Sequence, residues 1–203
     1  LFANWIRDGN YECSTGDWTE ETTDTYMISG GVVSNGGTCT GNVVIPEGVT
    51  QIGASAFANS FITAVALPAS VTYIAQGAFF NSTLESVSFE PNGNLQRIGL
   101  EAFRMTKLIS ISIPEGVQTI EESAFNYIPT LTSVTIPASV STIDGYNFYA
   151  SASLNSVFFL GNAPASIGTD VFTDIGSSAK IYIKSGNTSF ITDAGKWNGL
   201  TVA

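Results

Sequence analysis

Residues 43–57 read VVIPEGVTQIGASAF, and residues 111–125 repeat this pattern as ISIPEGVQTIEESAF. Both stretches end in Ile-x-x-x-x-Phe, a hexapeptide that occurs six times in the chain. Its isoleucines follow one another at steps of 22, 24, 22, 23 and 24 residues. They are Ile52, Ile74, Ile98, Ile120, Ile143 and Ile167. A near-constant period of this size predicts a solenoid, in which successive units stack as turns of one long coil.

Each unit has three parts with distinct physical roles. The aliphatic-x-aliphatic segment, Val43–Ile45 in the first unit, predicts a strand with two inward side chains. A proline ends most of these strands, because it has no N–H for a β-ladder. The segment Val-x-x-Ile predicts a short extended or turn region with two more core residues. The segment Gly-x-x-Ala-Phe predicts a tight helical or 3₁₀ turn. One unit cannot bury its own apolar face, so neighbouring units must stack.

The phenylalanine of each hexapeptide is expected to point into the interior and to meet its counterparts in register. The six side chains form the predicted structural spine, with offset or edge-to-face ring contacts. They are Phe57, Phe79, Phe103, Phe125, Phe148 and Phe172.

The repeats at residues 43–57 and 111–125 resemble the BspA-like leucine-rich repeat of bacterial and protist surface proteins. The resemblance covers residues 43–172 and implies a right-handed solenoid with a parallel β-sheet on its concave side. It also implies a secreted or cell-surface location and roles in adhesion and protein binding, and it carries no catalytic residues. Two features depart from the family pattern. The cysteine often found after Ala-Phe is missing, and one residue is inserted around Asn92–Asn94.

The repeats divide the chain into three regions. We expect an N-terminal cap at residues 1–42, about six repeat turns at 43–172 and a C-terminal cap at 173–203, because a solenoid needs atypical ends to cover its core. The first region holds Trp5, Trp18 and a dense group of acidic residues. Within it, the sequence predicts a β-hairpin whose strands are residues 25–29 and 31–33. In the last region, residues 179–184 predict a final strand with edge-blunting lysines, and Trp197 is expected over the last apolar layer.

Cys13 and Cys39 are the only cysteines. An even count in a Ser-, Thr- and Gly-rich chain favours a disulfide and an oxidising compartment. The alternative is a pair of unpaired thiols in a loosely ordered cap.

Composition excludes several classes of function. The chain has no histidine, which removes the usual general base near neutral pH and the commonest metal ligand. Its net charge is −10 and its seven basic residues form no stripe, so nucleic-acid binding lacks its electrostatic footprint. No apolar run approaches the ~20 residues that span a bilayer. We expect no enzymatic activity, no cofactor, no metal, no nucleic-acid partner and no membrane span in this chain.

Strand alternation predicts the outward residues of the concave sheet, and they form a flat surface of small hydroxyl and methyl groups. The candidate binding face comprises Ser86, Ser88, Ser110, Ser112, Ser133 and Thr135. Such a surface could accept another backbone or a glycan closely. The alternative is a bare scaffold, because these residues lack the aromatic and arginine anchors typical of binding hot spots.

Three other readings of the surface are weaker. Glu121 with Glu122 could suggest paired carboxylates for glycoside hydrolysis, but they fall on exposed repeat positions without a cleft. The acidic residues 17–24 could suggest a Ca²⁺ site, but they lack an ordered loop motif. Tyr73 and Arg97 interrupt the threonine ranks that an ice-binding surface would need.

The sequence thus favours a secreted or cell-surface, non-enzymatic module for adhesion or binding of a protein, extracellular-matrix or cell-surface ligand. Two alternatives remain open. One is a self-associating subunit of an extracellular assembly or filament, and the other is an accessory domain of a larger secreted enzyme.

Overall fold

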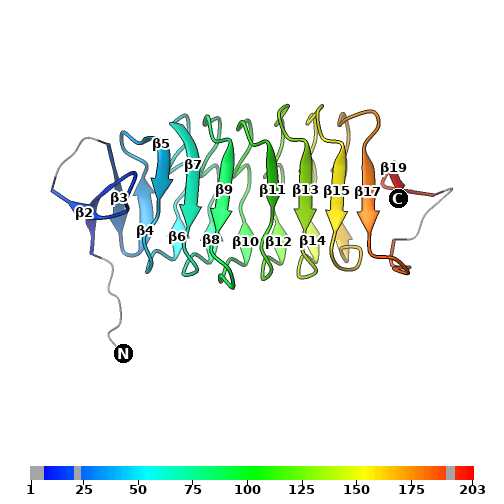
Figure 1. Ribbon diagram of the computed structural model, residues 1–203, viewed down its shortest axis with the longest axis horizontal. Coiled ribbons are helices and arrows are strands. Elements are labelled where there is room, and N and C mark those ends of the chain that lie inside the picture. Colours follow the sequence, from blue (N-terminus) through cyan, green and yellow to red (C-terminus); the bar gives the residue numbers. More distant parts are fainter. Residues whose placement is uncertain (1–6, 21–23, 191–194) are drawn as a thin grey trace.

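The computed structural model describes residues 7–20, 24–190 and 195–203, which form a parallel β-solenoid of about seven turns. Figure 1 shows the turns side by side along the long axis of the molecule. Each complete turn runs through a long strand, a proline-containing bend, a two-residue strand and a tight turn that leads to the next long strand. The predicted solenoid fold is confirmed, but it has about seven turns where the six hexapeptides predicted about six, because long strands occur before the first hexapeptide and after the last one.

The strands fall into three groups. The N-terminal strands are β1 (Gly9–Glu12), β2 (Trp18–Thr19), β3 (Thr25–Ser29) and β4 (Val32–Asn35). The long strands are β5 (Thr40–Val44), β7 (Phe61–Leu67), β9 (Ser86–Phe89), β11 (Ser110–Ser112), β13 (Ser133–Ile136), β15 (Ser156–Phe159) and β17 (Lys180–Ile183). The short strands are β6 (Gln51–Ile52), β8 (Tyr73–Ile74), β10 (Arg97–Ile98), β12 (Thr119–Ile120), β14 (Thr142–Ile143) and β16 (Ser166–Ile167). The chain closes with β18 (Lys196–Trp197) and β19 (Leu200–Val202).

The short strands pair in parallel in the order of the repeats, so each hexapeptide isoleucine lies beside its counterpart. Ile52 is in register with Ile74, and Ile120 with Ile143. All the hexapeptide isoleucines from Ile52 to Ile143 are fully buried. The sequence period therefore sets the register directly, because each step of 22 to 24 residues is one turn of the coil.

The phenylalanine spine is a column of nearly parallel rings. Neighbouring centroids from Phe57 to Phe172 lie 5.1 to 5.6 Å apart, with interplanar angles of 2° to 10°. The rings are offset-stacked throughout, and no edge-to-face pair interrupts them. Aromatic residues outside the repeats extend the column at both ends. Tyr26 lies 6.1 Å from Phe57, and Trp197 lies 6.4 Å from Phe172.

The Gly-x-x-Ala-Phe segments differ from the expected helical or 3₁₀ turns. Consecutive β-turns form them, and no regular helix occurs among the described residues. In the first repeat, the Ala56 and Ser60 N–H groups donate three residues back, to Gly53 and Phe57. Ser55 and Asn59, the third residues of these two turns, have φ of 55° and 59°. This geometry frees alternate N–H groups to bond the next coil, as from Phe57 to Ala78 O (2.7 Å).

Later coils repeat the two left-handed positions, four residues apart. They are Gly77 and Asn81, Glu101 and Met105, Ser123 and Tyr127, Tyr146 and Ala150, and Asp170 and Asp174. Only some of these residue types favour positive φ, which explains why the sequence did not disclose the turn type.

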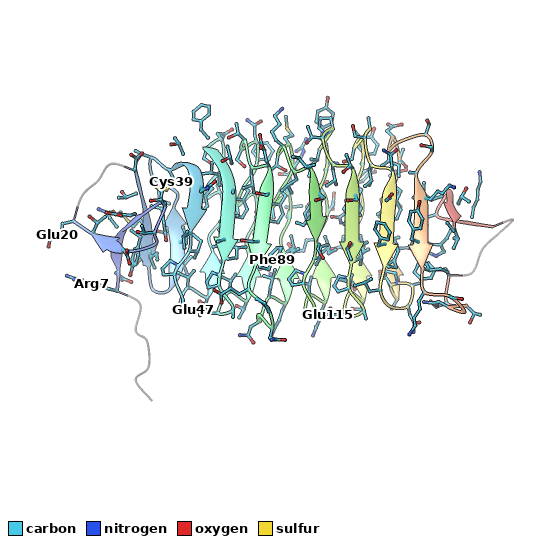
Figure 2. The ribbon with its side chains drawn as sticks, viewed as in Figure 1. Arg7, Glu20, Cys39, Glu47, Phe89 and Glu115 are labelled. Carbon is cyan, nitrogen blue, oxygen red and sulfur yellow. A yellow bond between two sulfur atoms is a disulfide. The ribbon has the colours of Figure 1, made fainter. Side chains whose placement is uncertain are left out.

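The bends after the long strands join neighbouring coils through reciprocal hydrogen bonds. The Pro-Glu-Gly bend of one coil faces the Pro-Ala-Ser bend of the next. Glu115 accepts the Ala138 N–H (3.0 Å), and Ser139 accepts the Gly116 N–H (3.0 Å). Glu47 and Ser70 make the equivalent pair of bonds with Ala69 and Gly48. Figure 2 shows Glu47 and Glu115 along the same lower edge of the molecule.

The N-terminal region covers the first coil with antiparallel strands. The predicted hairpin is present, since β3 and β4 pair antiparallel, and β1 adds to β3. The predicted disulfide between Cys13 and Cys39 is also present. The disulfide holds the segment around Cys13 against the outer edge of β5, where the Val44 N–H donates to Cys13 O (2.7 Å). Trp5 lies outside the described residues.

The C-terminal region departs from the sequence expectation in one respect. β17 is not the final strand, because β19 pairs with it in parallel and β18 then pairs antiparallel with β19. Lys180 and Lys184 therefore do not protect a free edge. Trp197 occupies the expected place over the last apolar layer, with edge contacts to Phe159 and Phe190. The division at residues 42 and 173 remains our proposal, although parallel pairing extends from β4 to β19.

Candidate binding face of the long strands

The long strands β5, β7, β9, β11, β13, β15 and β17 lie side by side in chain order (Figure 1), and their outward side is called here the long-strand face. Two columns of outward side chains run along it. They are in register from β5 to β9 and again from β11 to β17, because the strands within each of these groups pair in parallel. The first column contains Asn42, Ala64, Ser86, Ser110, Ser133, Ser156 and Lys180. The second contains Val44, Ala66, Ser88, Ser112, Thr135, Phe158 and Tyr182.

The six candidate residues predicted from the sequence lie in the middle of this face, two on each of β9, β11 and β13. Ser86, Ser88, Ser110 and Ser112 are exposed, whereas Ser133 and Thr135 are half-buried. Ser133 is in register with Ser110, and Thr135 with Ser112. The arrangement gives two rows of small hydroxyl groups. We propose that these rows form part of the binding surface.

The sheet beneath this zone is discontinuous between β9 and β11. β5, β7 and β9 form a three-stranded sheet, and β11 starts a separate six-stranded sheet. The residue inserted around Asn92–Asn94 lies in the bend just after β9, and Val87 and Phe89 of this strand are only half-buried. Figure 2 shows Phe89 near the lower end of its strand.

A shallow hollow of about 250 Å³ lies at the lower ends of the first three long strands. Aliphatic and proline side chains line most of it, with Phe89 on one side and Glu90 at its margin. Its outward residues Val44, Ala66 and Ser88 belong to the second column of the face. The hollow therefore forms an apolar end to the long-strand face.

The opposite end of the face carries an aromatic pair that the sequence reasoning did not include in the candidate site. Phe158 of β15 and Tyr182 of β17 stack with their centroids 4.8 Å apart. Phe158 is 37 % exposed, and Lys180 stands beside the pair in the first column. Alternation along residues 156–159 and 179–184 places Phe158 and Tyr182 outward, but the sequence predicted the second of these segments to be a protected final edge.

The short strands carry a different surface. Arg97 lies over the Tyr73 ring at 4.4 Å and pairs with Glu121 at 2.9 Å. These three side chains already interact with one another. They therefore leave fewer groups available to a ligand than the long-strand face does.

The described residues contain no group of three or more His, Cys, Asp or Glu side chains arranged to hold a metal ion. Glu121, considered as a catalytic carboxylate, accepts hydrogen bonds from Arg97 and from the Leu100 N–H. Within the same described residues, no helix is long and apolar enough to cross a membrane.

Comparisons with known proteins match this architecture. The crystal structure of the leucine-rich repeat protein TpLRR of T. pallidum is 28 % identical, with a TM-score of 0.61 over 70 % of this chain and 80 % of that one. The pneumococcal vaccine antigen PcpA is 21 % identical, with a TM-score of 0.65 over 84 % and 51 % of the two chains. A leucine-rich cell surface protein from Faecalibacterium prausnitzii is 24 % identical, with a TM-score of 0.55 over 83 % and 55 %. The chain thus spans about half the length of these last two proteins.

A comparison with curated protein sequences finds no match. A family model described as the BspA type leucine-rich repeat region matches in six copies, over residues 36–155 and 91–196. These matches cover most of the chain and include all six hexapeptides. The protein therefore belongs to the BspA-type leucine-rich repeat family.

Proposed function

We propose that this chain is a non-enzymatic interaction module that acts in a secreted or cell-surface protein and binds a protein ligand through its long-strand face. The repeat fold suits protein interaction, and two of the similar structures are a vaccine antigen and a cell surface protein. Adhesion is the use of this module that we favour.

The aromatic pair at the end of the face carries the proposal. Binding hot spots are enriched in aromatic and arginine side chains, with small or polar residues around them that exclude water. Phe158 and Tyr182 supply such an anchor, and the hydroxyl rows extend from it along neighbouring strands. The small residues of these rows let a partner chain approach the sheet closely.

The long-strand face also offers chemical contrast along its length. It changes from the apolar hollow on β5, β7 and β9, through hydroxyl groups, to the aromatic pair with Lys180. A ligand that matches all three zones would be bound in one direction only, which favours specific recognition over general stickiness.

The alternative of a filament subunit receives less support. The first long strand, β5, has its outer side covered, since Val44 donates to Cys13 O and accepts from the Tyr26 hydroxyl (2.6 Å). Growth by strand addition at this end would require the N-terminal segment to leave. The alternative of an accessory domain in a larger enzyme is compatible with the same binding face.

The test is binding of the purified chain to immobilised extracellular-matrix proteins and to intact cells. We expect Phe158→Ser with Tyr182→Ser to weaken binding at least tenfold, since hot-spot truncations cost about 2 kcal/mol or more. Ser112→Arg with Thr135→Arg should also block binding by obstructing the middle of the face.

Gln118→Arg, on the short-strand surface, is the matched control for an added arginine. It should bind like the natural chain. Equal losses in Gln118→Arg and in the variant with both Ser112→Arg and Thr135→Arg, or undiminished binding in the aromatic double variant, would overturn the assignment of the face.

A further inference from the structure

Three tyrosines gather on the surface formed by the Gly-x-x-Ala-Phe turns, away from the long-strand face. Tyr146 and Tyr149 meet edge to face with their centroids 6.0 Å apart. Tyr127 lies on the preceding coil, where its backbone N–H donates to Tyr149 O (2.8 Å). Tyr127 is 52 % exposed and Tyr146 is 39 % exposed. The tyrosine cluster, as we call these three residues, thus presents a large aromatic surface to solvent.

Two of these tyrosines stand at positions that the fold would fill more favourably with other residues. Tyr127 and Tyr146 have φ of 58° and 57°, in the left-handed region that costs most side chains about 1 kcal/mol or more. The equivalent turn position to Tyr127 is held by Asn59 and Asn81 in earlier coils, and asparagine tolerates this conformation better. A bulky, exposed residue with a strained backbone lowers stability, and such residues are expected at positions that serve a function.

Two carboxylates complete the cluster on the next coil. The Tyr146 and Ala150 N–H groups donate to Thr169 O (2.9 Å) and Thr173 O (3.0 Å), which places Asp170 and Asp174 beside the tyrosines. Hydrogen bonding to Asp174 and the charge of its carboxylate raise the pKa of Tyr149. Asp170 lies close enough to Tyr149 to contribute in the same direction. Both aspartates are exposed.

Within the described part of the chain, neither Asp170 nor Asp174 forms an ion pair, although Asp170 accepts a hydrogen bond from the Thr173 hydroxyl (3.0 Å). Arg97 pairs with Glu121, and Arg104 pairs with Glu101 and lies over Phe80. Exposed aromatic rings beside uncompensated carboxylates attract cations in two ways, through the ring quadrupole and through opposite charge. The net charge of −10 would add long-range attraction for a basic partner.

We propose that Tyr127, Tyr146 and Tyr149, with Asp170 and Asp174, form a second binding site that takes a lysine-rich segment of a protein partner. Lysine ammonium groups lie against the tyrosine rings while the aspartates accept their hydrogen bonds. This site is separate from the long-strand face, so one chain can hold two partners, or two parts of one partner, at once.

The test is calorimetric titration of the whole chain with a hexalysine peptide at physiological ionic strength, with hexaglutamate as the opposite-charge probe. We expect hexalysine to bind and hexaglutamate not to bind. Tyr127→Asn with Tyr146→Asn should weaken hexalysine binding about tenfold, since each exposed cation–π contact contributes a severalfold change. The same variant should have an unchanged or higher melting temperature, because asparagine relieves the left-handed strain.

Matched variants separate this site from general electrostatics and from the long-strand face. Asp174→Asn should weaken binding, whereas Glu85→Gln, an equal loss of charge at an exposed position before β9, should not. Ser112→Arg with Thr135→Arg should retain hexalysine binding even where it abolishes adhesion. Equal effects of Asp174→Asn and Glu85→Gln, an unchanged affinity in the tyrosine double variant, or no binding of hexalysine would overturn the proposal.

Discussion

The middle coils and the N-terminal region both bury apolar side chains between neighbouring segments, but they do so through different interactions. In the middle coils, each core side chain meets its own counterpart on both sides, as Phe125 does between Phe103 and Phe148. In the N-terminal region, single interactions replace the repeated ones. Tyr26 takes the place of a phenylalanine, and its hydroxyl bonds to Val44 O, while the Cys13–Cys39 disulfide holds the strand edge.

The difference shows where stability comes from in a solenoid. Repeated contacts between neighbouring coils give many similar contributions, so the energy of the array is close to a sum of units and interfaces. A terminal unit has a neighbour on one side only, and it needs additional bonds to remain folded. Changes in the two regions should therefore differ in size and in how far their effects extend.

The largest effect is expected from breaking the spine in the middle of the array. Phe125→Ala should lower the free energy of unfolding by about 3–5 kcal/mol, because it removes a fully buried ring and leaves a cavity between two stacked neighbours. Chemical denaturation measures this change. Phe158→Ala, which truncates an exposed ring on the long-strand face, is the control and should cost about 1 kcal/mol. Similar losses in the two variants would contradict the buried spine.

Removal of the disulfide tests the N-terminal side of the comparison. Cys13→Ser with Cys39→Ser should reduce stability by about 3 kcal/mol, since the bond closes a loop of 26 residues in the unfolded chain. The loss should also have a local signature in hydrogen exchange. The Val44 N–H should lose protection when the segment carrying Cys13 detaches, while the strands β13 and β15 keep theirs.

Reduction of the natural chain serves as the control for the two serine substitutions and should give the same pattern of exchange. Equal loss of protection in β5 and β15 would show that the N-terminal region and the coils unfold as one unit, and the comparison between them would fail.

The sequence predicted the features that repeat and missed those that occur once. The six phenylalanines and isoleucines were predictable because each position was observed several times at one spacing. Tyr26 was not recognised as a spine residue, since its segment has no repeat to align with. The strands β18 and β19 were missed for the same reason.

The left-handed turn positions could not be predicted from the types of residue that occupy them. Glu101, Met105 and Tyr146 do not favour positive φ, and only stacking between coils holds them there. A signal was nevertheless available for Tyr127, because alignment of the repeats places it in the column of Asn59 and Asn81. The face of the long strands was predicted from alternation, which also places Phe158 outward. Its stacking on Tyr182 was not predicted, because residues 179–184 were expected to form a final edge strand.

The smallest effect concerns the hydroxyl of Tyr26, which the spine phenylalanines lack. Tyr26→Phe should cost about 1 kcal/mol at neutral pH through loss of the hydrogen bond to Val44 O. Burial raises the pKa of Tyr26 strongly, and Tyr11 and Asp17 add to this. Below the unfolded-state pKa of about 10, the tyrosine is neutral in both states and its contribution is complete. Above that pH only the unfolded chain ionises, so stability is lost as pH rises towards the folded-state pKa.

The variant Tyr26→Phe lacks this pH-dependent loss of stability at residue 26. Melting temperatures measured from pH 7 to 11.5 should therefore start lower in Tyr26→Phe and approach those of the natural chain above pH 10. Parallel curves for the two proteins would contradict the buried, hydrogen-bonded state of this tyrosine. Because no middle coil has a titratable group in its spine, the alkaline loss should begin at the N-terminal region, where hydrogen exchange of β3 and β4 would detect it first.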